Sequence, residues 1–191
     1  MTLLIGILLS VLQPFFLALE QNTLKSDFVV TISETATQPL SYTGSFVLRG
    51  ERFTLNMMQI EAAYDGKTLY MYSPETDELQ LTEPTGEELS QANPLVFAKL
   101  VAKECETLER DKGEQVLLVL VPRDKTKTNG IGRIELLLQK PKGSETRYLP
   151  VSVEMKEGKR TTTLRLNNAA YITTTPSFKI DKPGAFINDL R

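Results

Sequence analysis

Short runs in which apolar and polar residues alternate dominate this chain and constrain its fold most strongly. The stretch YDGKTLYMYSPETDELQLTEP (64–84) is the clearest case. An Asp-Gly pair opens it, a Ser-Pro pair divides it, and leucine or methionine alternates with polar residues and tyrosines in each arm. A period of two is typical of a strand with one buried face. The stretch therefore predicts a β-hairpin with strands at Thr68–Tyr72 and Glu78–Thr82.

The same period recurs on both sides of this hairpin, with glycines marking the turns between runs. Residues 20–34 are predicted to begin as a helix and to end as a strand at Phe28–Ile32. A last strand is predicted at Ser177–Ile180. The other predicted strands are Ser45–Leu48, Phe53–Met57, Gln115–Val121, Arg133–Gln139, Leu149–Met155 and Thr161–Leu166.

After the hairpin the apolar spacing changes to that of a helix, in TGEELSQANPLVFAKLVAKE (85–104). Thr85 and Glu88 form a capping-box pattern, because their side chains can satisfy free N–H groups at a helix start. The Asn-Pro pair at 93–94 predicts a break into two short helices. The second helix is predicted to run from Pro94 to about Glu106.

These elements predict a mainly β (α+β) fold, built on an antiparallel sheet of about eight or more strands joined by short connections. Such a sheet must either close into a barrel or have something lie across its apolar face. The 191 residues, of which 41% are hydrophobic and 24% charged, suffice for one domain with its own core.

The first 19 residues carry no charged side chain. The run Leu3–Leu12 has the length of the apolar region of a signal peptide, and Pro14 follows it. The segment has no basic start and no small-x-small cleavage site, so an uncleaved anchor and a buried first helix stay as alternatives. We expect export, with residues 1–19 as a signal-peptide-like segment and residues 20–191 as a single domain.

The composition excludes several function classes. The chain has no histidine, which rules out serine–histidine and cysteine–histidine nucleophile pairs and histidine-based zinc motifs. The net charge is −2, so the chain lacks the excess of basic residues with which nucleic-acid binders contact phosphates. Cys105 stands between two glutamates, which disfavour a reactive thiolate and indicate an unreactive, partly buried cysteine. We therefore predict no catalytic residue, no metal and no cofactor. An enzyme would need a buried carboxylate pair in a cleft.

Apolar alternation on four consecutive predicted strands fits either a packed core or a pocket for a flexible apolar ligand. Methionine is unbranched and adapts to irregular partners, which suits a pocket. Arg49 follows an inward-pointing leucine, and its five donors suit the carbonyls at a helix end. The candidate lining residues are Phe46, Leu48, Phe53, Leu55, Met57, Leu69, Met71, Leu79 and Leu81, with Leu95 and Phe97 from the predicted helix.

Five stretches resemble segments of the periplasmic outer-membrane lipoprotein carriers, the LolA-like family, and they occur in the family's order. The resemblance covers the chain from about residue 24 to its end. In the second stretch, Arg49 lies four residues before Phe53, a spacing that is similar to the family's, although Gly50 stands where a proline is common. The stretches are KSDFVVTI (25–32), GSFVLRGERF (44–53), the hairpin at 64–84, NPLVFAKL (93–100) and FKIDKPGAFINDLR (178–191).

The resemblance implies a half-open, strongly curved antiparallel β-barrel with helices as a lid over an apolar cavity. It implies a monomeric carrier that takes lipoproteins from an inner-membrane ATP-driven (ABC) release complex, shields their acyl chains in the periplasm and passes them to an outer-membrane acceptor. It also implies that Arg49 latches the lid. Leu69, Met71, Leu79 and Leu81 should then line the concave side, with Tyr70 and Tyr72 on the convex, wetter side. The alternative is a non-enzymatic structural or interaction protein of the cell envelope, with a filled core and with or without an N-terminal anchor.

Overall fold

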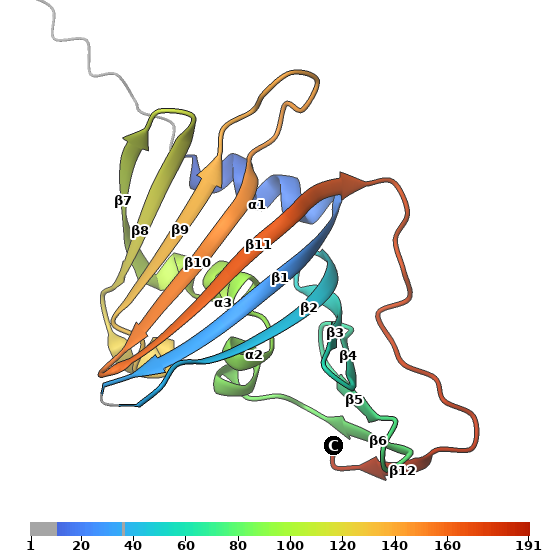
Figure 1. The fold of residues 1–191 in the computed structure, drawn as a ribbon. Helices are drawn as coiled ribbons and strands as arrows, with labels where there is room; N and C mark the ends of the chain where they lie inside the picture. Colours follow the sequence, from blue (N-terminus) through green and yellow to red (C-terminus); the bar gives the residue numbers. More distant parts are fainter. Residues whose placement is uncertain (1–10, 36) are drawn as a thin grey trace, which may run out of the picture.

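One curved, mainly antiparallel sheet with short helices against its inner face makes up the computed structural model, which describes residues 11–35 and 37–191 (Figure 1). In chain order the strands are β1 (Thr23–Glu34), β2 (Leu40–Arg49), β3 (Arg52–Met57), β4 (Ile60–Tyr64), β5 (Leu69–Ser73), β6 (Glu78–Thr82), β7 (Cys105–Lys112), β8 (Gln115–Pro122), β9 (Arg133–Gln139), β10 (Leu149–Glu157), β11 (Arg160–Ile172) and β12 (Phe186–Asp189).

The strands follow the order β12-β6-β5-β4-β3-β2-β1-β11-β10-β9-β8-β7. Most neighbours are joined by short turns, but the central pair β1 and β11 comes from opposite ends of the chain, with Thr23 beside Ile172 and Glu34 beside Arg160. The sheet ends at β12 and β7 and is therefore open, as predicted.

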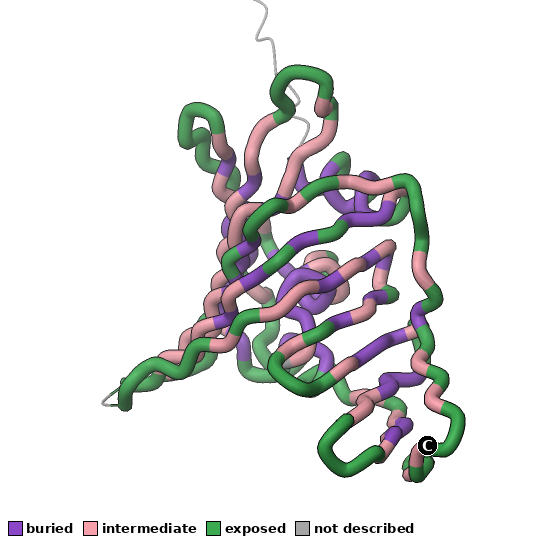
Figure 2. Tube along the Cα trace, turned by 45° about the vertical axis from the view of Figure 1, so that its right-hand side comes forward, coloured by how far each residue is buried: buried purple, intermediate pink, exposed green. Residues whose placement is uncertain are grey.

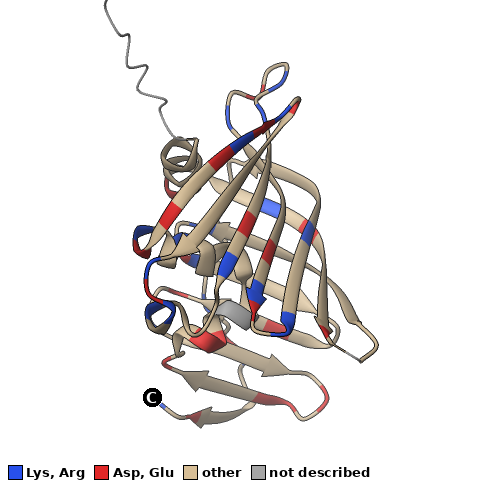
Figure 3. Ribbon diagram, turned by 90° about the vertical axis from the view of Figure 1, so that its left-hand side faces the viewer, with Lys and Arg blue, Asp and Glu red and all other residues tan. Residues whose placement is uncertain are grey.

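The β7 edge is protected by charge. Charged side chains on an edge strand oppose pairing with a second sheet. Acidic and basic positions are mixed along the outer strands and turns, which agrees with the small net charge (Figure 3). The exposed charged residues of β7 are Glu106, Glu109, Arg110, Asp111 and Lys112.

The apolar inner face of the sheet is covered by helices α1 (Leu12–Gln21), α2 (Gly86–Ala92) and α3 (Pro94–Val101) (Figure 1). Phe15 and Leu19 of α1 are 0% and 1% exposed, and Leu95 of α3 is 0% exposed. They share one core cluster with side chains from both halves of the sheet. Buried positions alternate with exposed ones along the strands around these helices (Figure 2).

The predicted capping and break in residues 85–104 are confirmed. Thr85 and Glu88 form the complete capping box at the start of α2, and Asn93 separates the two helices. The prediction that the second helix reaches about Glu106 was wrong. Helix α3 ends at Val101, a 3-10 turn η1 (Ala102–Glu104) follows, and β7 begins. Strands β4, β7 and β12 were not predicted. Strand β7 lies at an edge and is rich in charged residues, so its sequence lacks the apolar alternation of a half-buried strand.

The prediction that residues 20–34 begin as a helix and end as a strand is confirmed only in outline. Glu20 and Gln21 are the last residues of α1, and strand β1 already starts at Thr23 rather than near Phe28. Residues 1–10 of the predicted export segment lie outside the described residues. Residues 12–19 lie in α1, and the carbonyl of Leu19 accepts the N–H of Gly50 at 2.8 Å. The boundary after residue 19 stays a prediction, but a cut there would remove the buried face of α1.

The C-terminal segment corrects another prediction. Residues 177–180 form no strand, and the chain instead runs past the sheet to place β12 parallel to β6 (Figure 1). Phe178 is buried, with the guanidinium of Arg52 5.1 Å from its ring centroid. Phe178 thus gives residues 177–180 a buried apolar side chain, although the segment has no regular secondary structure.

None of the helices in the described part of the chain is long and apolar enough to cross a membrane.

Phe15→Ala tests whether α1 belongs to the mature fold. Emptying a buried phenylalanine site costs about 3–5 kcal/mol, so the variant should unfold at a much lower urea concentration. Leu17→Ala is the matched control, because Leu17 lies in the same helix but is 55% exposed; it should change stability by less than about 0.5 kcal/mol. Equal urea midpoints for both variants and the parent protein would show that the folded protein does not use α1.

Candidate functional site: a groove between sheet and helices

The inner face of the sheet is apolar because strand register brings alternating apolar positions into line. Leu48 pairs with Phe53, and Phe46 pairs with Leu55. The next pair along, Tyr64 and Leu69, continues the same face across β4 and β5. These side chains are buried and belong to the core cluster that includes the helices.

Two adjoining cavities remain between this face and the helices, and we call them together the groove. The larger measures about 220 Å³ and the smaller about 20 Å³. Both are lined by Val30 and Met57, so they meet there. The larger is further lined by Ile32, Tyr42, Glu87, Asn129, Ile131, Met155, Glu157, Arg160 and Thr162, and the smaller by Phe28, Phe46, Leu55, Ala92, Asn93, Pro94 and Leu164.

The groove is apolar inside and polar at its rim. Glu87, Asn129 and Glu157 are exposed, and Arg160 is half-buried beside them. Even the larger cavity is below the roughly 300–1,000 Å³ of a typical small-molecule pocket. The helices therefore occupy most of the space that the curved sheet encloses.

The predicted lining residues divide into four groups, the last of which is Leu79 and Leu81. Phe46, Leu55 and Met57 line the groove. Met71 is half-buried on the same face of the sheet, in a shallow hollow next to Ile60. The remaining residues on the predicted face pack in the core without lining the groove: Leu48, Phe53, Leu69, Leu95 and Phe97.

The prediction for Leu79 and Leu81 was wrong. Leu79 pairs with Tyr72 and Leu81 pairs with Tyr70, so both leucines face the opposite side of the sheet from Met71. They form a second cluster there with Ala63 and Tyr70, covered by Ile180 and Ala185. Each arm of the hairpin alternates as predicted. The turn between Ser73 and Glu78 sets the register of the two strands, and this register places the two leucines opposite the tyrosines rather than opposite Leu69 and Met71.

The tyrosines lie on the convex side, as expected, but that side is not wetter at Tyr70. Tyr70 is only 8% exposed, because the C-terminal segment covers its cluster. Tyr72 is half-buried, and its hydroxyl donates to Asp77 at 2.9 Å. The convex face thus carries a small core of its own.

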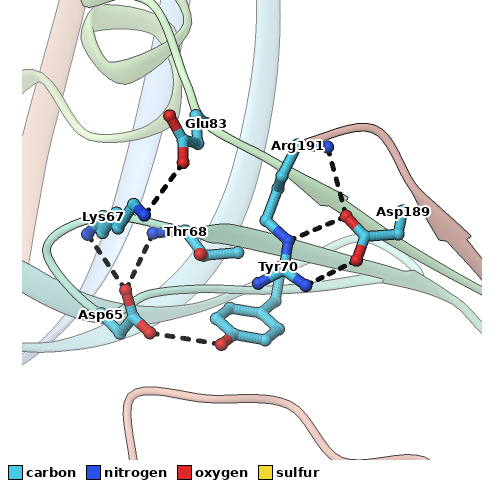
Figure 4. Close-up of polar contacts among 7 residues, drawn as sticks. All are labelled: Asp65, Lys67, Thr68, Tyr70, Glu83, Asp189 and Arg191. Atoms are coloured by element: carbon cyan, nitrogen blue, oxygen red, sulfur yellow. Dashed lines mark hydrogen bonds and ion pairs between the residues drawn. The ribbon is translucent and has the colours of Figure 1, made fainter.

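The hairpin's Asp-Gly turn is a structural device (Figure 4). Asp65 Oδ1 accepts the N–H groups of Lys67 at 3.0 Å and Thr68 at 2.8 Å, and Oδ2 accepts the Tyr70 hydroxyl at 3.2 Å. Burial raises the pKa of Asp65, but these bonds favour the carboxylate more strongly and leave the pKa below its ordinary value. The ion pair of Lys67 with Glu83 at 3.2 Å joins the turn to the end of β6.

Arg49 holds the end of α1. Its Nε donates to the carbonyl of Glu20 at 3.4 Å, and its Nη1 donates to the Thr175 hydroxyl at 3.2 Å. The expected contact with carbonyls at a helix end is present, and the helix is α1. The role of Arg49 as a lid latch stays a prediction.

Lys99 ties α3 to its surroundings, a role that was not predicted from the sequence. Its Nζ lies 2.6 Å from Glu20 Oε1 and 3.3 Å from Glu51 Oε1. The lysine side chain is 12% exposed, whereas the two carboxylates are about half exposed. These pairs join α3 to the end of α1 and to the turn between β2 and β3. Lys99 lies in the stretch 85–104 that was predicted to be helical, but no sequence pattern identified its partners.

The remaining candidates for chemistry are Cys105 and a metal site. Cys105 is buried, and its thiol donates to the Val101 carbonyl at 3.4 Å. Burial raises the pKa of the Cys105 thiol; the Arg123 charge opposes this shift and Glu104 adds to it. Across the described residues, no group of three or more cysteines and carboxylates is arranged to hold a metal ion.

No protein-family model matches the chain, and a search of curated proteins gave no match. An uncharacterized conserved protein from Thermus thermophilus superposes with a TM-score of 0.59 at 12% identity, over 94% of this chain and 96% of that one. The likeness shows a shared fold.

Two further solved structures superpose less well. A LolA superfamily protein, NE2245 from Nitrosomonas europaea, gives a TM-score of 0.47 at 9% identity, over 89% of this chain and 96% of its own. A DUF1329 family protein from Desulfovibrio piger gives 0.48 at 10% identity, over 87% and 93%.

Asp65→Asn should reduce the pH dependence of stability. A carboxylate whose pKa is lowered in the folded state stabilises the fold above its unfolded pKa of about 3.9, and this contribution is lost as pH falls below that value. The variant should unfold about 1 kcal/mol more easily at pH 7 and lose less stability between pH 6 and pH 3. Urea unfolding across this pH range measures both effects. Asp181→Asn, at an exposed residue of the C-terminal segment, is the control. A variant curve parallel to the parent's would contradict the role of Asp65.

Proposed function

We propose that the protein is a periplasmic carrier that binds the acyl chains of lipidated proteins in the groove. The observation that carries this proposal is an apolar groove with the sheet as one wall. Its other wall is formed by the short helices α2 and α3 and the loop at residues 129–131. The sequence resemblance to lipoprotein carriers independently supports the same function. Shielding a chain from water needs an apolar space and makes or breaks no covalent bond, so we propose no catalytic activity.

The small volume of the groove supports a lid mechanism. A bound chain needs more space than the cavities offer, so α2 and α3 must move outward as it enters. Burying an acyl chain is worth about 0.8 kcal/mol per CH₂. The chain and the helices compete for the same apolar face, and this competition lowers the net affinity enough for later release.

The finer parts of the proposal follow the resemblance. We propose that an inner-membrane ABC release complex loads the carrier and that an outer-membrane acceptor unloads it. Export to the periplasm requires a leader. Because residues 12–19 pack in α1, we propose that the folded carrier retains them.

The second candidate is a structural or interaction protein of the cell envelope. The core favours it, because Phe15, Leu19 and Leu95 already fill most of the enclosed space. In that case α2 and α3 are permanent parts of the core, and an apolar ligand has no route to the sheet.

Binding of a lipopeptide distinguishes the two candidates. The purified protein is titrated with an apolar fluorescent dye, and a triacylated lipopeptide is then added to displace the dye. The same peptide without acyl chains should displace none. If neither dye nor lipopeptide binds, the carrier function is wrong and the filled-core alternative holds.

Met57→Trp tests whether the lipopeptide binds in the groove. The larger side chain fills the junction of the two cavities and should weaken lipopeptide binding by about tenfold, the equivalent of about 1.4 kcal/mol. Met71→Trp is the matched control, since Met71 is a half-buried methionine on the same face of the sheet but outside the groove. Equal weakening by both variants would place the binding site elsewhere.

Lys99→Met should loosen the lid. Removing the ties to Glu20 and Glu51 raises the population of the open form, so the apparent affinity for the dye should increase about two- to fivefold. The free energy of unfolding should fall by about 1 kcal/mol, the usual scale for such partly exposed pairs. Lys103→Met, at an exposed lysine just beyond α3, should change neither quantity. An unchanged or weaker affinity in Lys99→Met would show that Lys99 does not restrain the lid.

A further inference from the structure

Asn93 lies at the junction of the two lid helices and serves both. Its backbone N–H donates to the Leu89 carbonyl at 2.9 Å and so ends α2. Its side-chain Oδ1 accepts the N–H groups of Leu95 at 3.1 Å and Val96 at 3.3 Å, and so begins α3. The residue is 2% exposed.

The other half of the Asn93 amide lacks an acceptor. Within the described structure, Nδ2 is buried and has no hydrogen-bond partner. The orientation of the amide follows from the cap, because only the oxygen can accept the two backbone N–H groups. The nitrogen is therefore the free group, and Asn93 is one of the residues that line the smaller cavity of the groove.

The free donor is not required for capping. Aspartate, serine and asparagine cap helices about equally well, and only asparagine adds an NH₂ group. Leaving a buried donor unpaired is unfavourable by about 1–3 kcal/mol. The surroundings of the smaller cavity are otherwise apolar, among them Phe28, Val30 and Leu164. A single polar group in such a lining is typical of a site that orients an apolar ligand.

We propose that Asn93 Nδ2 donates a hydrogen bond to the carbonyl oxygen of an acyl ester, and that the chain extends from there past Val30 and Met57 into the larger cavity. This inference rests on the proposed acyl-chain binding and adds its point of recognition. An ester carbonyl is a neutral acceptor at the head of an apolar chain, so it matches a neutral donor in an apolar lining. A cavity of about 20 Å³ also has room for one water molecule, which is the competing partner for Nδ2.

The inference predicts a preference for ester-linked over ether-linked lipids. A diacylglycerol has ester carbonyl oxygens, whereas a dialkylglycerol ether of equal chain length has none. Displacement of the apolar dye should show the full-length protein binding the ester roughly 2- to 12-fold more tightly, the range expected for one hydrogen bond. Asn93→Asp keeps the cap oxygen but replaces the donor by an acceptor, and it should bind the two lipids equally.

The ratio of the two affinities within one protein cancels general effects of the added charge. Asn56→Asp, at an exposed residue of β3 outside the groove, adds the same charge and should keep the ester preference. Equal binding of ester and ether by the unmodified protein would overturn the inference but leave acyl-chain binding standing. An ester preference that persists in Asn93→Asp would also overturn the inference but leave acyl-chain binding standing. Failure of the unmodified protein to bind dye or lipid would overturn the proposed function and the inference together.

A second measurement does not depend on the folding of the variant. In a ¹⁵N-labelled protein, the Asn93 side-chain NH₂ signals should shift when the ester lipid binds and shift much less with the ether lipid. If the lipid displaces the dye and these signals stay in place, Nδ2 keeps another partner such as water, and the inference is wrong.

Discussion

The structure depends on one constraint: a sheet that does not close must have its apolar inner face covered by something else. Here the cover consists of α1, α2 and α3, whose buried side chains share a core with both halves of the sheet. The convex face meets the same constraint on a smaller scale. There the C-terminal segment covers Tyr70, Leu79 and Leu81.

Helix α1 and the α2–α3 pair are attached to the sheet in different ways, and this difference bears on function. The end of α1 is fixed by backbone hydrogen bonding between Leu19 and Gly50, by Arg49 and by Lys99. Helix α3 contributes Lys99 and a mostly apolar surface, and Asn93 links it to the short α2. Apolar contacts are non-directional and can be replaced by other apolar matter. The α2–α3 pair is therefore the part of the cover that a hydrocarbon chain is best suited to replace.

Alternation and capping patterns predicted most of the sheet and the start of both lid helices, because these depend on neighbouring residues. Strand β6 was predicted over its observed range, Glu78–Thr82. The face of Leu79 and Leu81 was missed, because it depends on the turn that sets the register of the hairpin. The groove's Met155 was missed because β10 reaches the site only through the long-range pairing of β1 with β11. The unpaired nitrogen of Asn93 is a property of the folded environment, and no spacing rule reports it.

The position of β1 in the middle of the sheet has a consequence for how the protein folds. Its two neighbours are β2, which follows directly, and β11, which is made only after residue 160. Contacts between such distant segments carry a large loop-closure cost, and chains that depend on them fold slowly. The two halves of the sheet therefore cannot join until nearly the whole chain has been synthesised. Until β11 is made, one edge of β1 stays unpaired and open to pairing with another strand.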